Sequence, residues 1–445
     1  MIVPRTRLMF WVAVIVLPFA LLAAVAPGSA AISLLLIGGF LLVAIIDAIG
    51  GRQRLGGIGV ELPATIRMSK DREAKIEMRI FNPGQQKTNL RLALAWPREL
   101  KPKDEEVDAA LPANSEWSRI ILPCTPLRRG RYHLKLAFVE SGSPFGLWAA
   151  RKAVPVQSEI RIYPNLLPER KNLASLFLNR GTFGIHAQRQ IGKGREFEKL
   201  REYVPGDGYD EIHWKATARR GRPITKVFQI EKTQEVYVIV DASRLSARKP
   251  EVDSNSETTV LERFITASLV LGLAAEQQGD LFGLLTFSDR VEKFVRAKNG
   301  QAHYNACRDA LYTLQPRIVT PDFDELCTFI RLRLRRRALL VFLTALDDPA
   351  IAENFVRNMD LIRRQHVVLV NMVRPPGVQP IFAGKDVTEL DDLYRHLGGH
   401  LQWHNLRELQ TVLQRRGVRF SLLDNEGLSA ELVSQYMSVK QRQLL

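Results

Sequence analysis

Residues 235–245 have the sequence EVYVIVDASRL, an almost unbroken apolar run that ends in an aspartate and a serine. A strand covered on both faces is apolar throughout, whereas a strand with one face in water alternates apolar and polar residues. The stretch therefore predicts a buried strand of a parallel sheet. Asp241 and Ser243 are two residues apart, so both side chains leave its carboxyl end on the same side.

Further apolar runs follow this strand and alternate with helical patterns, the clearest of which is at 261–278. The runs lie at 280–287, 338–344, 366–373 and 418–424. Strands that alternate with helices are typical of a doubly wound parallel sheet. We therefore expect residues 226–445 to form an α/β domain whose ligands bind at the carboxyl ends of its strands.

The pair Asp241 and Ser243 resembles the D-x-S-x-S motif of the metal-ion-dependent adhesion site in von Willebrand factor A domains. The resemblance implies a von Willebrand factor A-like fold and a Mg²⁺ site. It also implies a threonine from a later loop, for which Thr320 is the candidate, and a carboxylate after the fourth strand.

Two positions depart from that motif. Leu245 has no oxygen to offer, and Ala345 replaces the expected carboxylate, so Asp347 and Asp348 stand two and three residues further on. Mg²⁺ demands near-ideal octahedral geometry, so losing two ligands weakens a site severely. The candidate metal site is therefore degenerate, and an alternative is that its strand-end residues only cap the loop through hydrogen bonds. Its members are Asp241, Ser243, Thr320 and Asp347.

A second motif precedes the sheet at 192–223, with the sequence GKGREFEKLREYVPGDGYDEIHWKATARRGRP. It resembles the hallmark of the bacterial family catalogued as domain of unknown function 58, in which G-x-G-x-E-F, L-R-x-Y-x-x-G-D and I-x-W-K-x-x-A-R follow in order. The match includes Glu196, Arg201, Tyr203, Asp207, Trp214, Lys215 and Arg219. Asp210 and His213 depart from it, since many members have arginine and aspartate there.

The charged residues of this motif can pair among themselves, while Phe197, Tyr203 and Trp214 supply apolar faces that would anchor the segment to a domain. One interpretation is a structural clasp, because buried charge networks are costly unless fully paired. The other is a docking face for a partner protein.

The N-terminus contains two uncharged apolar stretches, 8–26 and 30–49, separated only by Pro-Gly-Ser. Each is long enough to cross a bilayer core of about 30 Å as a helix. Arginines flank both outer ends, so the positive-inside rule predicts an inner-membrane hairpin with both chain ends cytoplasmic. A cleaved signal peptide is the alternative, since VAPGSAA resembles a cleavage site. We interpret Asp47 as a side chain that snorkels to the interface.

Residues 55–165 show alternating segments broken by Pro and Gly, at 74–84, 89–97, 117–123 and 131–140. That pattern predicts an immunoglobulin-like antiparallel β-sandwich, which the SPFGLW stretch at 143–148 would close as an apolar corner. The expected organisation is an anchor at 1–54, the sandwich at 55–165, a connector with the signature motif at 166–225 and the α/β domain at 226–445.

Charge and composition exclude several classes of function. The net charge of +16 comes without a zinc finger, RNA-recognition signature or basic zipper, so a membrane-adjacent basic surface is favoured over nucleic-acid binding.

The three cysteines lack any C-x-x-C spacing and indicate buried thiols. His396, His400 and His404 have metal-ligand spacing, but Gly398 and Gly399 between them are expected to end the helix.

The resemblance implies a function as well as a fold. Members of the family are typically encoded beside MoxR-type AAA+ ATPases and are thought to act with them as adaptors. We therefore expect a membrane-anchored scaffold that binds this ATPase and client proteins, without catalysis or a small-molecule substrate. The alternative is a Mg²⁺-dependent hydrolase or phosphoryl-transfer enzyme that uses Asp241 with Asp347 or Asp348.

Overall fold

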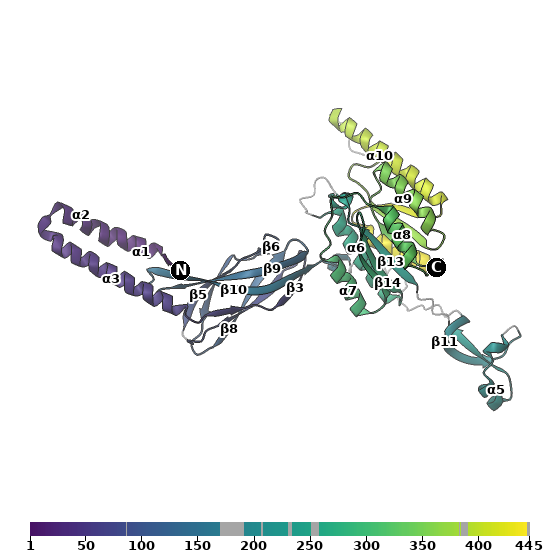
Figure 1. The fold of residues 1–445 in the computed structure, drawn as a ribbon, viewed down its shortest axis with the longest axis horizontal. Helices are drawn as coiled ribbons and strands as arrows, with labels where there is room; N and C mark the ends of the chain where they lie inside the picture. The colour runs from purple at the N-terminus through teal and green to yellow at the C-terminus, as the bar shows by residue number, and fades with distance from the viewer. Residues whose placement is uncertain are drawn as a thin grey trace. The chain divides into compact units, whose positions relative to one another are not determined.

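The computed structural model describes residues 1–85, 87–169, 191–205, 208–229, 234–250, 258–381, 383 and 390–442. The side chains of Pro27, Gln53, 191–199 and 227–229 are outside this description. The chain divides into two compact units, Met1–Asn165 and Leu166–Leu445 (Figure 1). Each unit is described by itself.

The first unit begins with a hairpin of apolar helices (Figure 1). Its first arm comprises α1 (Thr6–Trp11), the π-helical turn η1 (Val12–Val16) and α2 (Leu17–Val25); its second arm is α3 (Ala30–Arg54). The 3₁₀ turn η2 (Pro27–Ser29) joins the two arms. Both arms are long and apolar enough to cross a membrane, and most of their side chains are exposed in the chain itself. These properties suggest membrane association.

The π-helical turn has a local cause. Pro18, two residues after the turn, has no N–H to donate, and its ring opposes the carbonyl oxygen one turn earlier. Widening that turn relieves the clash without breaking the helix. The first apolar arm therefore continues from Thr6 to Val25.

The rest of the first unit consists of two β-sheets around one apolar core. One sheet has the order β1-β10-β9-β5-β7, with β3 paired to β10, and the other has the order β2-β4-β8-β6. Ile76 and Met78 of β4 and Leu90 and Leu92 of β5 meet in the core between them. The first sheet comprises β1 (Ile2–Pro4), β3 (Thr65–Ser69), β5 (Thr88–Leu94), β7 (Glu106–Leu111), β9 (Gly130–Gly142) and β10 (Trp148–Tyr163); the second comprises β2 (Gly59–Glu61), β4 (Ala74–Phe81), β6 (Leu100–Pro102) and β8 (Trp117–Pro126).

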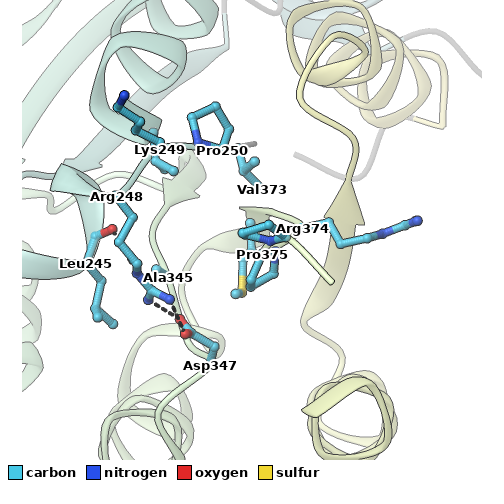
Figure 2. Close-up of a pocket in the computed structure, with 12 residues that line it drawn as sticks. Leu245, Arg248, Lys249, Pro250, Ala345, Asp347, Val373, Arg374 and Pro375 are labelled. Atoms are coloured by element: carbon cyan, nitrogen blue, oxygen red, sulfur yellow. Dashed lines mark hydrogen bonds and ion pairs between the residues drawn. The ribbon is translucent and has the colours of Figure 1, made fainter. Parts of the chain in front are cut away.

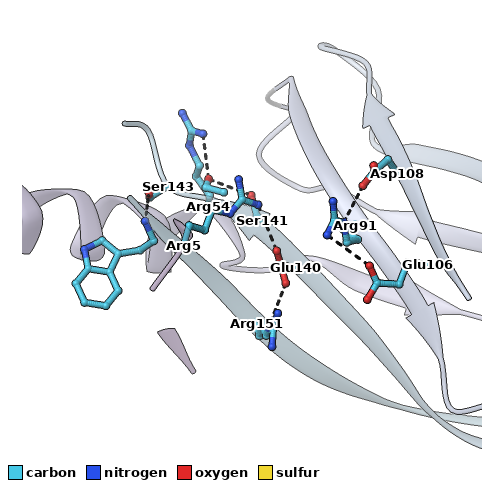
Figure 3. A network of polar contacts seen from close by, with 11 residues as sticks. Arg5, Arg54, Arg91, Glu106, Asp108, Glu140, Ser141, Ser143 and Arg151 are labelled. Carbon is cyan, nitrogen blue, oxygen red and sulfur yellow. Dashed lines mark hydrogen bonds and ion pairs between the residues drawn. The ribbon is translucent and has the colours of Figure 1, made fainter. Parts of the chain in front are cut away.

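Both ends of the helical hairpin are bonded to the first sheet. Before α1, strand β1 pairs antiparallel with the start of β10, and Arg5 forms an ion pair with Glu140, which also binds Arg151 (Figure 3). At the end of α3, Arg54 Nη1 donates to the Gly142 carbonyl oxygen at 3.3 Å. The sheet is thus attached to both arms and not only to the end of the second.

Asp47 is the centre of this junction. It is 1% exposed, and its carboxylate accepts hydrogen bonds from Ser143 Oγ at 2.5 Å, Phe145 N at 2.8 Å and Leu147 N at 3.1 Å. The interpretation of Asp47 as a snorkelling side chain is therefore wrong, because its charge is buried beneath the 143–147 turn. The SPFGLW stretch therefore connects β9 to β10 and also binds α3 through Asp47.

The first prediction concerns this carboxylate. In Asp47→Ala the turn loses the acceptor of three donors, and each buried donor left unsatisfied costs about 1–3 kcal/mol. We expect the amides of Phe145 and Leu147 to exchange hydrogen much faster than in the parent chain. Asp108→Ala is the control, because Asp108 is exposed and its ion pair with Arg91 lies at the surface. Unchanged protection of both amides in Asp47→Ala would contradict this account of the junction.

The second unit contains a six-stranded mixed sheet with helices on both faces. Its order is β15-β14-β13-β16-β17-β18, in which only β15 is antiparallel to its neighbour. The predicted alternation of strands and helices is present. The edge strand β15 was not predicted from the sequence. The strands are β13 (Glu235–Asp241), β14 (Leu281–Phe287), β15 (Val291–Lys298), β16 (Leu339–Leu343), β17 (Val367–Val373) and β18 (Arg419–Leu423).

Each face of this sheet has its own apolar cluster. Val236, Val238 and Val240 of β13 point into one cluster with α6, α7 and α11, whereas Tyr237 and Ile239 point into the other with α8, α9 and α10. This division explains why residues 236–240 of β13 are all apolar or aromatic. The helices are α6 (Val260–Gln277), α7 (Gln301–Leu311), α8 (Phe323–Arg333), α9 (Pro349–Ile362), α10 (Leu390–Arg415) and α11 (Leu428–Gln441).

Helix α10 passes without interruption through Gly398 and Gly399. The expectation that these glycines end the helix is therefore wrong. A Cβ on Gly399 would overlap the carbonyl oxygen of Gly377, so this glycine allows the helix to approach the loop after β17. His396, His400 and His404 consequently share one helix, but no group of three or more His, Cys, Asp or Glu side chains in the described residues is arranged to hold a metal.

The second prediction compares the two glycines of α10. Gly398→Ala adds a methyl group into open space and should stabilise the helix by up to about 1 kcal/mol, the usual difference between the two residues. Gly399→Ala should destabilise the domain, because its methyl group meets the Gly377 backbone. Thermal unfolding and hydrogen exchange in α10 would measure both. Equal effects of the two substitutions would contradict the close approach.

Candidate functional site

Asp241 ends β13 as a buried carboxylate. Thr344 Oγ1, just beyond β16, donates to its Oδ2 at 2.6 Å, and the Ser243 N–H donates to its Oδ1 at 2.8 Å. Burial raises the pKa of Asp241 above its ordinary value, although these hydrogen bonds favour the charged form. The carboxylate holds two strand ends together, as the loop-capping alternative expects.

Asp347 and Asp348 each bind an arginine from the loop after β13. Arg248 forms a bidentate pair with Asp347, with Nη1 to Oδ2 at 2.6 Å and Nη2 to Oδ1 at 2.7 Å (Figure 2). Arg244 Nη2 lies 3.1 Å from Asp348 Oδ2, and Asp348 Oδ1 also caps α9 by accepting from Ala350 N at 3.0 Å. Each carboxylate is therefore neutralised within the chain by a cation from η4 (Arg244–Ala247) or the residue after it.

Sequence reasoning missed both arginines. Arg244 and Arg248 are four residues apart in DASRLSAR, and two consecutive aspartates follow another strand of the same sheet. Opposite charges in loops at one edge of a parallel sheet are the signal that could have found this pairing.

Thr320 lies on the loop that runs beside these residues. Arg244 N donates to the Val319 carbonyl oxygen at 3.0 Å, and Arg317 N donates to that of Ala242 at 2.7 Å. Thr320 itself is exposed, and within the described residues no hydrogen bond joins it to Asp241. The structure thus brings together the loops of the expected site, while the oxygens of Asp241 and Asp347 already bind groups of the protein. A Mg²⁺ site at these residues stays a prediction.

An open hollow lies beside the Arg248–Asp347 pair (Figure 2). Its lining comes mainly from the carboxyl ends of β13, β16 and β17, next to the point between β13 and β16 where the strand order changes direction. Such switch points are the usual ligand positions in open α/β sheets. Three cations and one carboxylate contribute to the lining, which is otherwise mostly apolar. The lining residues are Leu245, Arg248, Lys249, Pro250, Val260, Ala345, Asp347, Met372, Val373, Arg374, Pro375 and Pro376.

The third prediction concerns magnesium. A site present only in the folded chain would add about 2.7 kcal/mol of stability at a Mg²⁺ concentration one hundred times its dissociation constant. We expect millimolar Mg²⁺ to leave the unfolding temperature of the full chain unchanged, because the Asp347 carboxylate already forms a bidentate ion pair with Arg248. A rise in unfolding temperature that Asp241→Ala abolishes would show instead that metal displaces the arginine.

The signature motif forms an antiparallel pair of strands, β11 (Ile191–Glu202) and β12 (Ile224–Gln229), with a short helix between them. The helix α5 (Trp214–Arg220) follows η3 (Tyr209–Glu211) and is capped at its start by His213, whose Nδ1 accepts a hydrogen bond from Ala216 N at 3.0 Å. It ends at Gly221, which has a φ of 66°. The departure from the family pattern at position 213 is thus a helix cap.

The predicted residues of this motif are only partly described. Asp207 lies outside the described residues, and the side chain of Glu196 is not described although its backbone pairs with Gln229. Arg201 and Tyr203 lie at the end of β11 and just after it, and Trp214, Lys215 and Arg219 lie on α5. The expectation that Trp214 anchors the segment by burial is wrong, since its side chain is 68% exposed.

Residues 199–380 match the family described as Protein of unknown function DUF58. This range includes part of the signature motif and the strands β13 to β17.

Curated relatives of similar sequence come from mycobacteria. Uncharacterized protein Rv1480 of Mycobacterium tuberculosis and Uncharacterized protein Mb1516 of Mycobacterium bovis are each 24% identical over 198 residues. The matched region is 43% of this chain and 59% of each relative.

Solved structures show only a distant likeness. Proximal thread matrix protein 1 from the mussel byssus gives a TM-score of 0.25 at 14% identity, with 45% of this chain and 43% of that chain covered. The YadV chaperone gives a TM-score of 0.17 at 10% identity, with 24% of this chain and 51% of that chain covered. Scores this low have no bearing on function.

Proposed function

We propose that this chain is a membrane-anchored adaptor that binds partner proteins through its second unit and catalyses no reaction of its own. The proposed partners are a MoxR-type AAA+ ATPase and the client proteins on which that ATPase acts. The proposed location is the inner membrane, with the soluble parts in the cytoplasm. The proposed fold of the second unit is von Willebrand factor A-like, which agrees with its strand order and with the loops gathered around Asp241.

The observation that carries the proposal is an exposed apolar stripe on α10. Its side chains are between 41% and 69% exposed, and their spacing of three and four residues places them along one side of the helix. They are Leu390, Leu393, Tyr394, Leu397 and Leu401. A contiguous exposed apolar surface of this kind is typical of a protein-binding site.

The side of α10 opposite the stripe packs beside the crevice at the carboxyl end of the sheet. Gly399 of α10 lies against Gly377, which follows the crevice residue Pro376, and Gln402 Nε2 lies 3.4 Å from Asp347 Oδ2. At about 100° per residue, Gly399 and Gln402 lie on the buried side of α10, so the stripe faces away from the crevice. A partner with an apolar groove would match the stripe.

The signature motif offers a second exposed aromatic surface. Tyr209 and Trp214 are both exposed, and Lys215, Arg219 and Arg220 share the helix with Trp214. Tryptophan, tyrosine and arginine are the residues that most often dominate binding energy at protein interfaces. This combination favours the docking-face interpretation of the motif over the structural clasp.

The test of the proposal, and the fourth prediction, is affinity capture from detergent-solubilised membranes of the native host. The wild-type chain should recover an AAA+ ATPase, whereas a variant with Tyr394→Ala, Leu397→Ala and Leu401→Ala should recover at least about tenfold less, the effect of about 1.4 kcal/mol. The matched control is Asn405→Ala with Gln414→Ala, two exposed polar positions on the same helix.

Three other results would count against the proposal. Equal recovery of the ATPase by both variants would remove α10 as its binding surface, and consistent absence of any AAA+ ATPase would remove that partner. Hydrolase or phosphoryl-transfer activity of the purified chain that Asp241→Ala abolishes would support the enzyme alternative.

A further inference from the structure

The 143–147 turn holds an exposed aromatic side chain in a fixed position next to α3. Phe145 is 63% exposed, although Ser143 and Leu147 on either side are buried. Its backbone N–H is bonded to Asp47, and Trp148 Nε1 donates to the Ala44 carbonyl oxygen at 2.8 Å. The turn thus holds an apolar ring at the surface, where it can contact an apolar environment outside the chain.

The turn lies beside the last part of the apolar arm of α3. Asp47 precedes Arg52, the end of the stretch apolar enough to span a membrane, by about 8 Å along the helix axis. Arginines at the end of a spanning helix lie at the level of the lipid headgroups. The turn that binds Asp47 is therefore at or just below the headgroup level on the side where the hairpin ends.

Arginine side chains surround the turn. A Cβ on Gly142 would lie 3.0 Å from Arg5 Nη1, and a Cβ on Gly146 would lie 3.3 Å from Arg7 Nη1. The Gly142 carbonyl oxygen accepts from Arg54. An exposed aromatic ring bordered by cations matches the boundary between anionic headgroups and acyl chains.

The other sheet presents a second aromatic side chain at the same end of the unit. Trp117 begins β8, is 46% exposed and packs against Phe81 in a tilted arrangement, with ring centroids 5.0 Å apart. Phe81 pairs with Gly59 of β2, the strand that follows α3. Tryptophan is enriched at membrane–water interfaces, so its place here agrees with the same boundary.

We propose that the 143–147 turn is a lipid-contact element, in which Phe145 enters the headgroup–acyl boundary of an anionic membrane. The contact holds the two β-sheets against the bilayer surface. It rests on the membrane association of the helical hairpin and is independent of the adaptor function.

The native cysteines allow a direct measurement of depth. Burial raises the pKa of Cys124 to about 11 and those of Cys307 and Cys327 to about 12, so all three stay protonated and inaccessible to thiol reagents. A single new surface cysteine can then carry a nitroxide label in the full chain. Phe145→Cys removes no core packing, because the side chain is exposed.

Two reference sites calibrate the label. Leu35→Cys places it on an exposed position of the spanning part of α3. Glu73→Cys places it in the turn between β3 and β4, where Lys70 N bonds the carbonyl oxygen of Tyr163 at the far end of β10. The 16 residues of β10 separate this turn from residues 143–147 by roughly 50 Å.

The experiment, which is the fifth prediction, compares label accessibility to membrane-soluble oxygen and to a water-soluble nickel complex. The chain is reconstituted into vesicles of phosphatidylcholine with or without phosphatidylglycerol. We expect the oxygen-to-nickel accessibility ratio at position 145 to exceed that at position 73 severalfold and to fall below that at position 35. The ratio at 145 should be higher with phosphatidylglycerol.

A ratio at 145 equal to that at 73 would overturn the proposal, since the turn would then lie in water and serve only to bind Asp47. A ratio at 145 that does not change with phosphatidylglycerol would overturn its anionic part. An aqueous ratio at position 35 would overturn its premise, the spanning of α3. None of these results depends on whether the chain binds an ATPase.

Discussion

The hydrogen bonds between the Asp47 carboxylate and the 143–147 turn are the interaction on which the first unit depends. A charge near the end of an apolar helix is costly unless other groups satisfy it. Here the 143–147 turn supplies one hydroxyl and two backbone N–H donors. Because the turn connects β9 to β10, the hydrogen bonds that satisfy the charge also fix the first sheet to the helical hairpin. The anchor and the β-sheets consequently behave as one compact unit.

Carboxylates at the carboxyl end of the sheet in the second unit are also stabilised by groups of the chain, but here arginines take part. Asp241 is buried with hydrogen bonds from Thr344 and Ser243, while Asp347 and Asp348 bind arginines from the loop after β13. In a divalent-metal site the cation would balance such carboxylates. Arg244 and Arg248 provide that balance here as permanent parts of the chain.

The sequence predicts the regular elements well where one local pattern decides them. The apolar run of β13 and the helical period of α6 are found within one residue of their expected positions. Interactions between distant segments were not predictable in the same way. In the sequence, Asp47 is a charged residue near the end of an apolar stretch, as expected at a membrane interface. Only its contact with a turn about one hundred residues later shows that it is buried.

The helix through Gly398 and Gly399 illustrates the same limit. Glycine pairs usually end helices, and tertiary packing against Gly377 reverses that preference. The arginine pairs at the candidate site also depend on spatial neighbours, since the partners are about one hundred residues apart. Local patterns therefore predicted where strand β13 ends. The pairing of charged side chains at that end could be seen only in the three-dimensional structure.

Strand β10 has a mechanical consequence. It starts at Trp148 beside the helical hairpin and ends at Tyr163, close to the last residue of the first unit, Asn165. It pairs with β9 along almost its whole length and with β3 over its final residues. A pulling force applied to the chain beyond Asn165 would load these pairings in shear, so many hydrogen bonds would share the load instead of opening one by one. Strand β10 would thus transmit such a pull to the helical hairpin before the sheets unfold.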